Sequence, residues 1–140
     1  MQTLSNELGG EVINSDIHEF GHAEISLKNN SPIFKNIHSK NNVLDVWMSH
    51  GDKVNVLPKN FEVIASSKDC QIAGFQSSDK KIFGLQFHPE VTSNTIKRWH
   101  DIVKIKYPYI DNLNKIMKDF KKHQFKNYDW FQSFLLKLLK

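Results

Sequence analysis

The spacing of apolar residues divides this chain of 140 residues into a short helical start, a long central stretch of strands and a helical tail. Residues 1–9 carry apolar side chains at helical spacing and end at Gly9-Gly10, which predicts a short helix. Further along, apolar positions alternate or form short blocks, as is typical of strands. After Val91 they recur every three or four residues, which predicts helices over residues 96–140.

The central stretch predicts short strands joined by short turns. Glu19-Phe20-Gly21 is expected to form a turn between the first two strands, and Ser77, Ser78 and Asp79 are expected to form a polar hairpin turn. The other strands are predicted at residues 43–48, 61–66, 72–75 and 81–85. Such a series is typical of the second half of a mixed sheet.

A histidine stands at the end of the last predicted strand. Pro89 has no N–H to give to a sheet, so it ends the strand and biases His88 toward an extended backbone. Glu90 supplies a carboxylate two residues further on. A neutral imidazole can accept a proton from a nucleophile when a carboxylate holds its other nitrogen. Taken alone, these three residues favour the alternative of a solvated turn.

The residues around His88 resemble one enzyme family. Phe83–Val91 is similar to the His/Glu segment of the class I glutamine amidotransferases, which use a Cys-His-Glu triad to release ammonia from glutamine. Val46–Asp52 is similar to the GMP synthase branch in particular. The match covers about residues 1–95, and several motifs in order make it specific. Its other parts are Met1-Gln2-Thr3, Glu19-Phe20-Gly21, Leu57-Pro58, Phe61, Val63-Ile64-Ala65-Ser66-Ser67 and Cys70.

The resemblance implies two catalytic residues and a substrate-binding set. His88 would protonate the departing ammonia and then activate water, while Glu90 would orient the imidazole. Substrate binding would fall to residues from two segments. These are Gln2, Ser49, His50, Gly51 and Asp52.

The last four of these residues are expected to form a loop over the glutamine pocket. The Ser49 hydroxyl and backbone N–H groups would bind the α-carboxylate of the substrate, and Asp52 would bind its α-ammonium group. Gly51 would let the backbone approach closely. In the family His50 is not the triad histidine, so a structural role is expected for it. A plain turn is the alternative, because Ser, Gly and Asp are turn formers.

The nucleophile of the family pattern is not found in this sequence. Gln2 fits the last position of Gly-x-Cys-x-Gly-x-Gln, which places the cysteine four residues earlier, ahead of residue 1. Cys70 matches a different family position and is expected to be a buried structural thiol. His18 stands where the family has an arginine, and it is expected to be an exposed turn residue. The chain is therefore expected to be inactive alone, with marginal stability or dependence on a partner.

The expected fold is α/β: the C-terminal portion of a class I glutamine amidotransferase, flavodoxin-like with a mixed sheet, with extra C-terminal helices. Residues 1–140 would form one partial domain, with a sheet portion over 1–95 and a helical tail over 96–140. This tail, with Trp99 and a final Trp-Phe-x-x-Phe-Leu helix, looks more like that of stand-alone amidotransferase-like proteins. These 140 residues are expected to contain neither a synthetase domain nor its ATP loop.

Composition agrees with a globular protein, with 39% hydrophobic residues, 24% charged residues and a net charge of +4. No apolar run is long enough to cross a bilayer, and no secretory leader opens the chain. With a single cysteine, a cytoplasmic setting is expected. Lysines interleave with aromatics after residue 96, but a solvated helical face is favoured over a nucleic-acid surface.

The expected partners are L-glutamine and a second chain that supplies the nucleophile half or accepts ammonia. No cofactor and no metal are expected. A non-catalytic remnant that binds glutamine or docks on another subunit is the main alternative. A nucleic-acid-binding protein that uses the basic tail ranks last.

Overall fold

The computed structural model describes residues 1–28, 31–35, 37, 39–91, 95 and 98. One helix and one five-stranded sheet make up most of this part of the chain. The strand order is β2-β1-β3-β4-β5, and neighbouring strands pair antiparallel. The elements in order are α1 (Gln2–Glu7), β1 (Glu11–Leu27), the 3-10 helices η1 (Pro32–Phe34) and η2 (Lys40–Asn42), β2 (Val43–Val56), β3 (Phe61–Ser66), β4 (Gly74–Ser77) and β5 (Phe83–Leu85).

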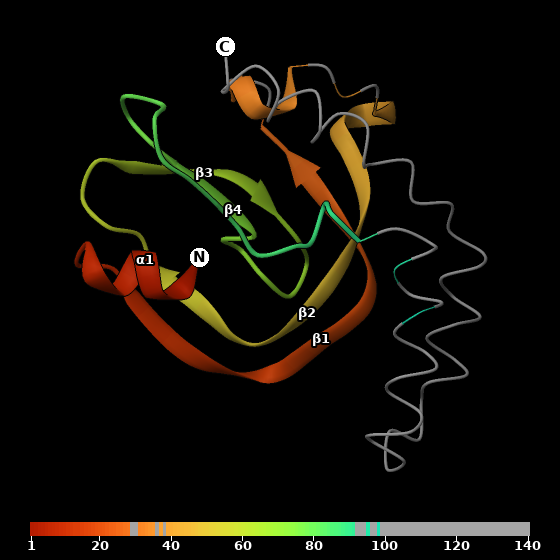
Figure 1. Ribbon diagram of the computed structural model, residues 1–140, viewed down its shortest axis with the longest axis horizontal. Coiled ribbons are helices and arrows are strands. Elements are labelled where there is room, and N and C mark those ends of the chain that lie inside the picture. Colours follow the sequence, from red (N-terminus) through yellow and green to blue (C-terminus); the bar gives the residue numbers. More distant parts are fainter. Residues whose placement is uncertain (29–30, 36, 38, 92–94, 96–97, 99–140) are drawn as a thin grey trace.

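The two longest strands, β1 and β2, pair along most of their length and curve around β3 and β4 (Figure 1). The predicted turn at Glu19-Phe20-Gly21 is wrong, because β1 continues through it. Instead, the pairing steps from Asn14 opposite Asp52 to Glu19 opposite His50. Residues 15–18 are thus accommodated as a wide bulge, which bends the ribbon without ending the strand. Gly21 has a φ of +108°, which favours glycine.

The core is built by alternating residues of the curved sheet. On β2 the side chains of Leu44, Val46 and Met48 are buried, and on β1 that of Ile25 is fully buried. Each such aliphatic side chain contributes about 1.5–3 kcal/mol when removed from water. A second cluster centres on Val54, Ile72 and Phe75, and Met1 and Leu4 of α1 pack against it. The sheet therefore holds α1 through apolar contacts.

Several predicted boundaries are confirmed and others shift. The helix at residues 1–9 is present as α1, with Gly9 at a φ of +86°, and the strand over 61–66 is β3. β4 begins two residues later than predicted, and β5 is shorter than predicted. The turn after Ser77 is confirmed, and there the Ser77 hydroxyl donates to Asp79 Oδ1 over 2.5 Å. The helices predicted over 96–140 lie outside the described residues.

No helix in the described part of the chain is long and apolar enough to span a bilayer.

Gly84 sits where β5 crosses the ring of Phe75. A Cβ atom at Gly84 would lie less than 3 Å from three carbons of that fully buried ring. Gly84→Ala should therefore lower the free energy of unfolding by about 1–3 kcal/mol, as overpacking does. Urea denaturation measures this. Gly51→Ala is the matched control, because its Cβ would meet only the His18 ring at 3.5 Å or more. Equal stability of the two variants would contradict the prediction.

Candidate functional site

The segment that carries His88 is held between two parts of the sheet. The Gln86 N–H donates to the Ala73 carbonyl over 2.8 Å, and the His88 N–H donates to the Trp47 carbonyl of β2 over 2.9 Å. The chain that follows β5 thus reaches β2, the strand at the other end of the sheet order. The predicted strand end at Pro89 is wrong, because β5 already ends at Leu85. Pro89 lies in the turn that follows, in which the Val91 N–H donates to the His88 carbonyl over 3.2 Å. The backbone of His88 is fixed on both sides.

The side chains of His88 and Glu90 meet. His88 Nδ1 lies 2.8 Å from Glu90 Oε1, and the two side chains are 36% and 55% exposed. An N–H at Nδ1 that donates to the carboxylate leaves the Nε2 lone pair free to act as a base. The predicted contact between the two side chains is therefore present, and both are open to solvent.

Gln2 connects the start of α1 to the same region. Its side-chain amide donates to Gln86 Oε1 over 3.1 Å and to the Asp52 carbonyl over 3.2 Å. Three predicted or neighbouring site segments therefore meet: the beginning of α1, β2 at Asp52, and the residues just before His88. The sequence reasoning missed Gln86, although a glutamine within an apolar strand was the signal that could have found it. Gln86 is buried, so its amide needs such a partner.

Ser49, His50, Gly51 and Asp52 do not form a loop, and that prediction is wrong. They belong to β2, where Ser49 pairs with Phe20 and Asp52 pairs with Asn14, because the long β1 strand supplies partners for their backbone groups. The Asp52 carboxylate accepts a hydrogen bond from Asn14 Nδ2 over 2.9 Å.

His50 is buried beside the bulge. Its side chain is 3% exposed, its Nε2 lies 2.9 Å from Glu19 Oε2, and its Nδ1 lies 3.1 Å from the Asp52 carbonyl. This setting agrees with a structural role. Glu19 was expected in a turn, and its approach to His50 was missed because it depends on strand pairing.

Cys70 lies in the same buried region, and the prediction of a buried thiol is confirmed. Its N–H donates to the Ser67 hydroxyl over 2.9 Å. The pKa of Cys70 is raised to about 11, chiefly by burial and also by the nearby charge of Glu19, while the Ile72 backbone and Lys53 act in the opposite direction. The thiol is protonated at neutral pH and is a poor nucleophile in this state.

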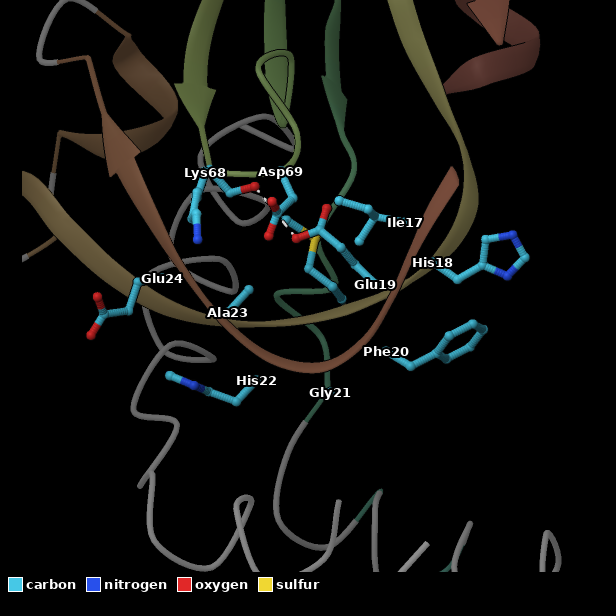
Figure 2. Close-up of a pocket in the computed structure, with 12 residues that line it drawn as sticks. Ile17, His18, Glu19, Phe20, Gly21, His22, Ala23, Glu24, Lys68 and Asp69 are labelled. Atoms are coloured by element: carbon cyan, nitrogen blue, oxygen red, sulfur yellow. Dashed lines mark hydrogen bonds between the residues drawn. The ribbon is translucent and has the colours of Figure 1, made fainter. Parts of the chain in front are cut away.

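An open pocket of about 520 Å³ lies next to this region. Figure 2 shows Glu19 pointing toward the loop that carries Lys68 and Asp69, while His18 and Phe20 point away from it. The Ser67 hydroxyl donates to Glu19 Oε1 over 3.4 Å at the wall of this pocket. His18 is exposed as expected, but it lies within β1 and not in a turn.

Comparisons with known proteins agree on one family. The model of the glutamine amidotransferase class-I family matches residues 1–100. The chain is 49% identical to the glutamine-hydrolyzing GMP synthase of Aromatoleum aromaticum over 102 residues, which cover 69% of this chain and 19% of that protein. It is 47% identical to the same enzyme of Ruthia magnifica over 93 residues, 66% of this chain and 18% of that protein. The chain thus spans about a fifth of the length of these relatives.

Solved structures agree with the expected fold. A glutamine amidotransferase from Thermotoga maritima matches with a TM-score of 0.79 and 25% identity, over 99% of this chain and 59% of that one. A glutamine amidotransferase from Methylobacillus flagellatus matches with a TM-score of 0.61 and 17% identity, over 95% and 59% of the two chains, and shows likeness of fold. The predicted α/β fold of the class I enzymes is confirmed.

Proposed function

The chain belongs to the class-I glutamine amidotransferase family, and on this premise we propose that it carries the acid–base half of a glutamine-hydrolysing site. The observation that carries the proposal is the 2.8 Å contact of His88 Nδ1 with Glu90 Oε1, on a backbone anchored to Trp47. The half-exposed imidazole keeps its Nε2 for a reacting group.

The reaction has two steps. A cysteine thiolate attacks the side-chain carbonyl carbon of glutamine, the C–N bond breaks, and the protonated His88 gives its Nε2 proton to the departing ammonia. His88 then takes a proton from water, which attacks the thioester and releases glutamate and the thiol. Glu90 holds Nδ1 and stabilises the imidazolium in both steps.

The nucleophile of this reaction is a residue other than Cys70. Cys70 is fully buried and its pKa is about 11, so it offers neither a thiolate nor access for glutamine. It is also the one cysteine among the 140 residues. We therefore infer that the chain alone does not hydrolyse glutamine, and that a second segment or chain supplies the thiolate. The scarcity of cysteine also supports our placing of this chemistry in the cytoplasm.

Substrate contacts are assigned to the residues around Gln2. The exposed Asp52 carboxylate would bind the α-ammonium group of glutamine, and the Ser49 hydroxyl would bind its α-carboxylate. Gln2 ties Asp52 to Gln86, two residues before His88. Gly51 has no side chain that would block the approach of glutamine to this part of β2. The hydrogen bond between His50 Nδ1 and the Asp52 carbonyl would hold Asp52 in place.

The test is glutamate release by the chain alone and by an extended chain. The extended chain carries, ahead of Met1, the amino-terminal segment of a class-I relative that includes its Gly-x-Cys-x-Gly elbow. We expect activity only in the extended chain, and only while its elbow cysteine is intact. Turnover by the chain alone, removed by Cys70→Ser, would overturn the assignment of the nucleophile. A folded extended chain without activity would overturn the proposed function.

Glu90→Gln in the extended chain should lower the rate of glutamate release by about 100-fold. The amide keeps the size of the side chain but loses the charge that stabilises the imidazolium, so part of the acid–base contribution is lost. The measurement is kcat at saturating glutamine. Glu7→Gln, at an exposed position of α1, is the control and should leave the rate unchanged. A Glu90→Gln rate within twofold of the unaltered rate would remove Glu90 from the site.

A non-catalytic docking module is the second candidate. Ile17 and Phe20 of β1 are 52% and 61% exposed, and such apolar side chains favour a partner surface. Binding of the 140-residue chain to a separately expressed nucleophile half, without restored activity, would support this candidate. Ile17→Ser combined with Phe20→Ser should then weaken the binding.

A further inference from the structure

Three side chains that bind metals in other proteins meet beneath the bulge of β1. Glu19 comes from β1, His50 from β2, and Cys70 from the loop between β3 and β4. One ligand atom of each lies within 4.8 Å of the other two. Strand pairing places Glu19 directly opposite His50. This Glu19–His50–Cys70 cluster is separate from the His88–Glu90 pair.

Two polar atoms of the cluster are left without hydrogen bonds. His50 Nε2 and Glu19 Oε2 are both buried, and within the described residues neither has a hydrogen-bond partner. They approach each other to 2.9 Å, but the approach is not aligned as a hydrogen bond. His50 Nδ1 faces the Asp52 carbonyl, which can only accept, so Nδ1 carries the proton. In the neutral imidazole, a lone pair of Nε2 therefore faces a carboxylate oxygen.

A cation bound by both His50 Nε2 and Glu19 Oε2 would satisfy the two atoms. Unpaired buried polar atoms cost free energy, so a structure retains them where a ligand satisfies them. The hydrogen bond from Nδ1 to a backbone carbonyl also orients the ring, as it commonly does for metal-binding histidines.

We propose that Glu19, His50 and Cys70 bind one Zn²⁺ ion. Thiolate, imidazole and carboxylate together suit zinc, whereas magnesium and calcium prefer oxygen ligands alone. The two negative ligands neutralise the ion, so the buried site carries no net charge. Tetrahedral bonds of about 2.0–2.3 Å set ligand atoms roughly 3.3–3.6 Å apart, so His50 Nε2 and Glu19 Oε2, which lie 2.9 Å apart, separate slightly to admit the ion. The Cys70 thiol gives up its proton on binding.

The pocket in Figure 2 gives the ion a path of entry. Glu19 and Ser67 line that pocket, and Glu19 is also a ligand of the proposed site. A water molecule from the pocket completes the tetrahedron. The bound ion ties β1 and β2 to the loop at Cys70, which makes its role structural. The sequence reasoning expected no metal, because the three residues are spread over fifty positions and have no ligand spacing.

The test uses the full 140-residue chain, stripped with a chelator and titrated with Zn²⁺ and with Co²⁺. We expect one equivalent of zinc per chain, and a thiolate-to-cobalt charge-transfer band. With a single cysteine in the sequence, this band can arise only from Cys70. Zinc at about 100 times its Kd should raise Tm by about 10 °C.

Variants locate the other ligands. Cys70→Ser should abolish the band, and Glu19→Gln and His50→Gln should weaken binding at least tenfold. His22→Gln is the matched control and should leave binding unchanged, because His22 pairs with Asp45 away from the cluster. A missing cobalt band, or zinc binding that survives Cys70→Ser, would overturn the proposal. The cluster would then be a buried ion pair of Glu19 and His50 beside a structural thiol. Should the variants fail to fold, the cobalt spectrum of the unaltered chain still decides. None of these readouts depends on glutamine hydrolysis.

Discussion

Replacing His88 by alanine in the extended chain should lower glutamine hydrolysis by about 10,000-fold, the upper range of a general acid–base contribution. The imidazole is needed twice, once as the acid that protonates ammonia and once as the base that activates water. In the described part of the chain, the Glu90 carboxylate is hydrogen-bonded to His88 Nδ1. The rate of glutamate release under single-turnover conditions measures the loss.

His22→Ala is the control for this loss, because His22 is also a histidine of the sheet surface that pairs with a carboxylate, Asp45. It should retain the unaltered rate. Added imidazole should restore part of the activity of His88→Ala, since the His88 side chain is 36% exposed and leaves an accessible space. A variant that keeps a tenth or more of the original activity would show that His88 is not the acid–base residue.

Phe75→Ala should lower the free energy of unfolding by about 3–5 kcal/mol. The Phe75 ring is fully buried and packs edge-on against Phe61, with ring centroids 5.4 Å apart and an interplanar angle of 86°. Gly84 lies against the same ring, so its neighbours would not readily fill the space that removal of the ring leaves. Since a whole domain has only about 5–15 kcal/mol of stability, this loss is a large fraction of the total.

Urea denaturation followed by circular dichroism measures the effect of Phe75→Ala. Phe20→Ala is the matched control, because that ring is 61% exposed and should change stability by less than about 0.5 kcal/mol. Similar midpoints for the two variants would show that the second core cluster contributes little to folding.

Local patterns were sufficient for the elements that depend on local chemistry. The apolar spacing and Gly9 define α1, and Pro89 stands in a turn just after His88. The same holds for the contact of His88 with Glu90, since the two residues are only two positions apart. The resemblance to the family then supports the role that we propose for this pair.

Long-range strand pairing produced the features that the sequence reasoning missed. The sequence predicts a turn at Glu19-Phe20-Gly21, but the chain instead forms a bulge at residues 15–18, opposite Gly51, within one strand. Glu19 is expected in that turn and His50 in a loop, and only the pairing of β1 with β2 brings them against each other. Gln86 accepts its hydrogen bond from Gln2, which lies at the other end of the matched region.

The hydrogen bond from the His88 N–H to the Trp47 carbonyl has a consequence for folding kinetics. It joins two segments that are far apart in the sequence, so it forms late, after loop closure has brought the two ends of the sheet together. Catalytic competence would then appear only at the final stage of folding. Partly folded intermediates would have strands, but His88 would not yet be in its proposed place. Amide hydrogen exchange at His88 would report when the contact with Trp47 has formed.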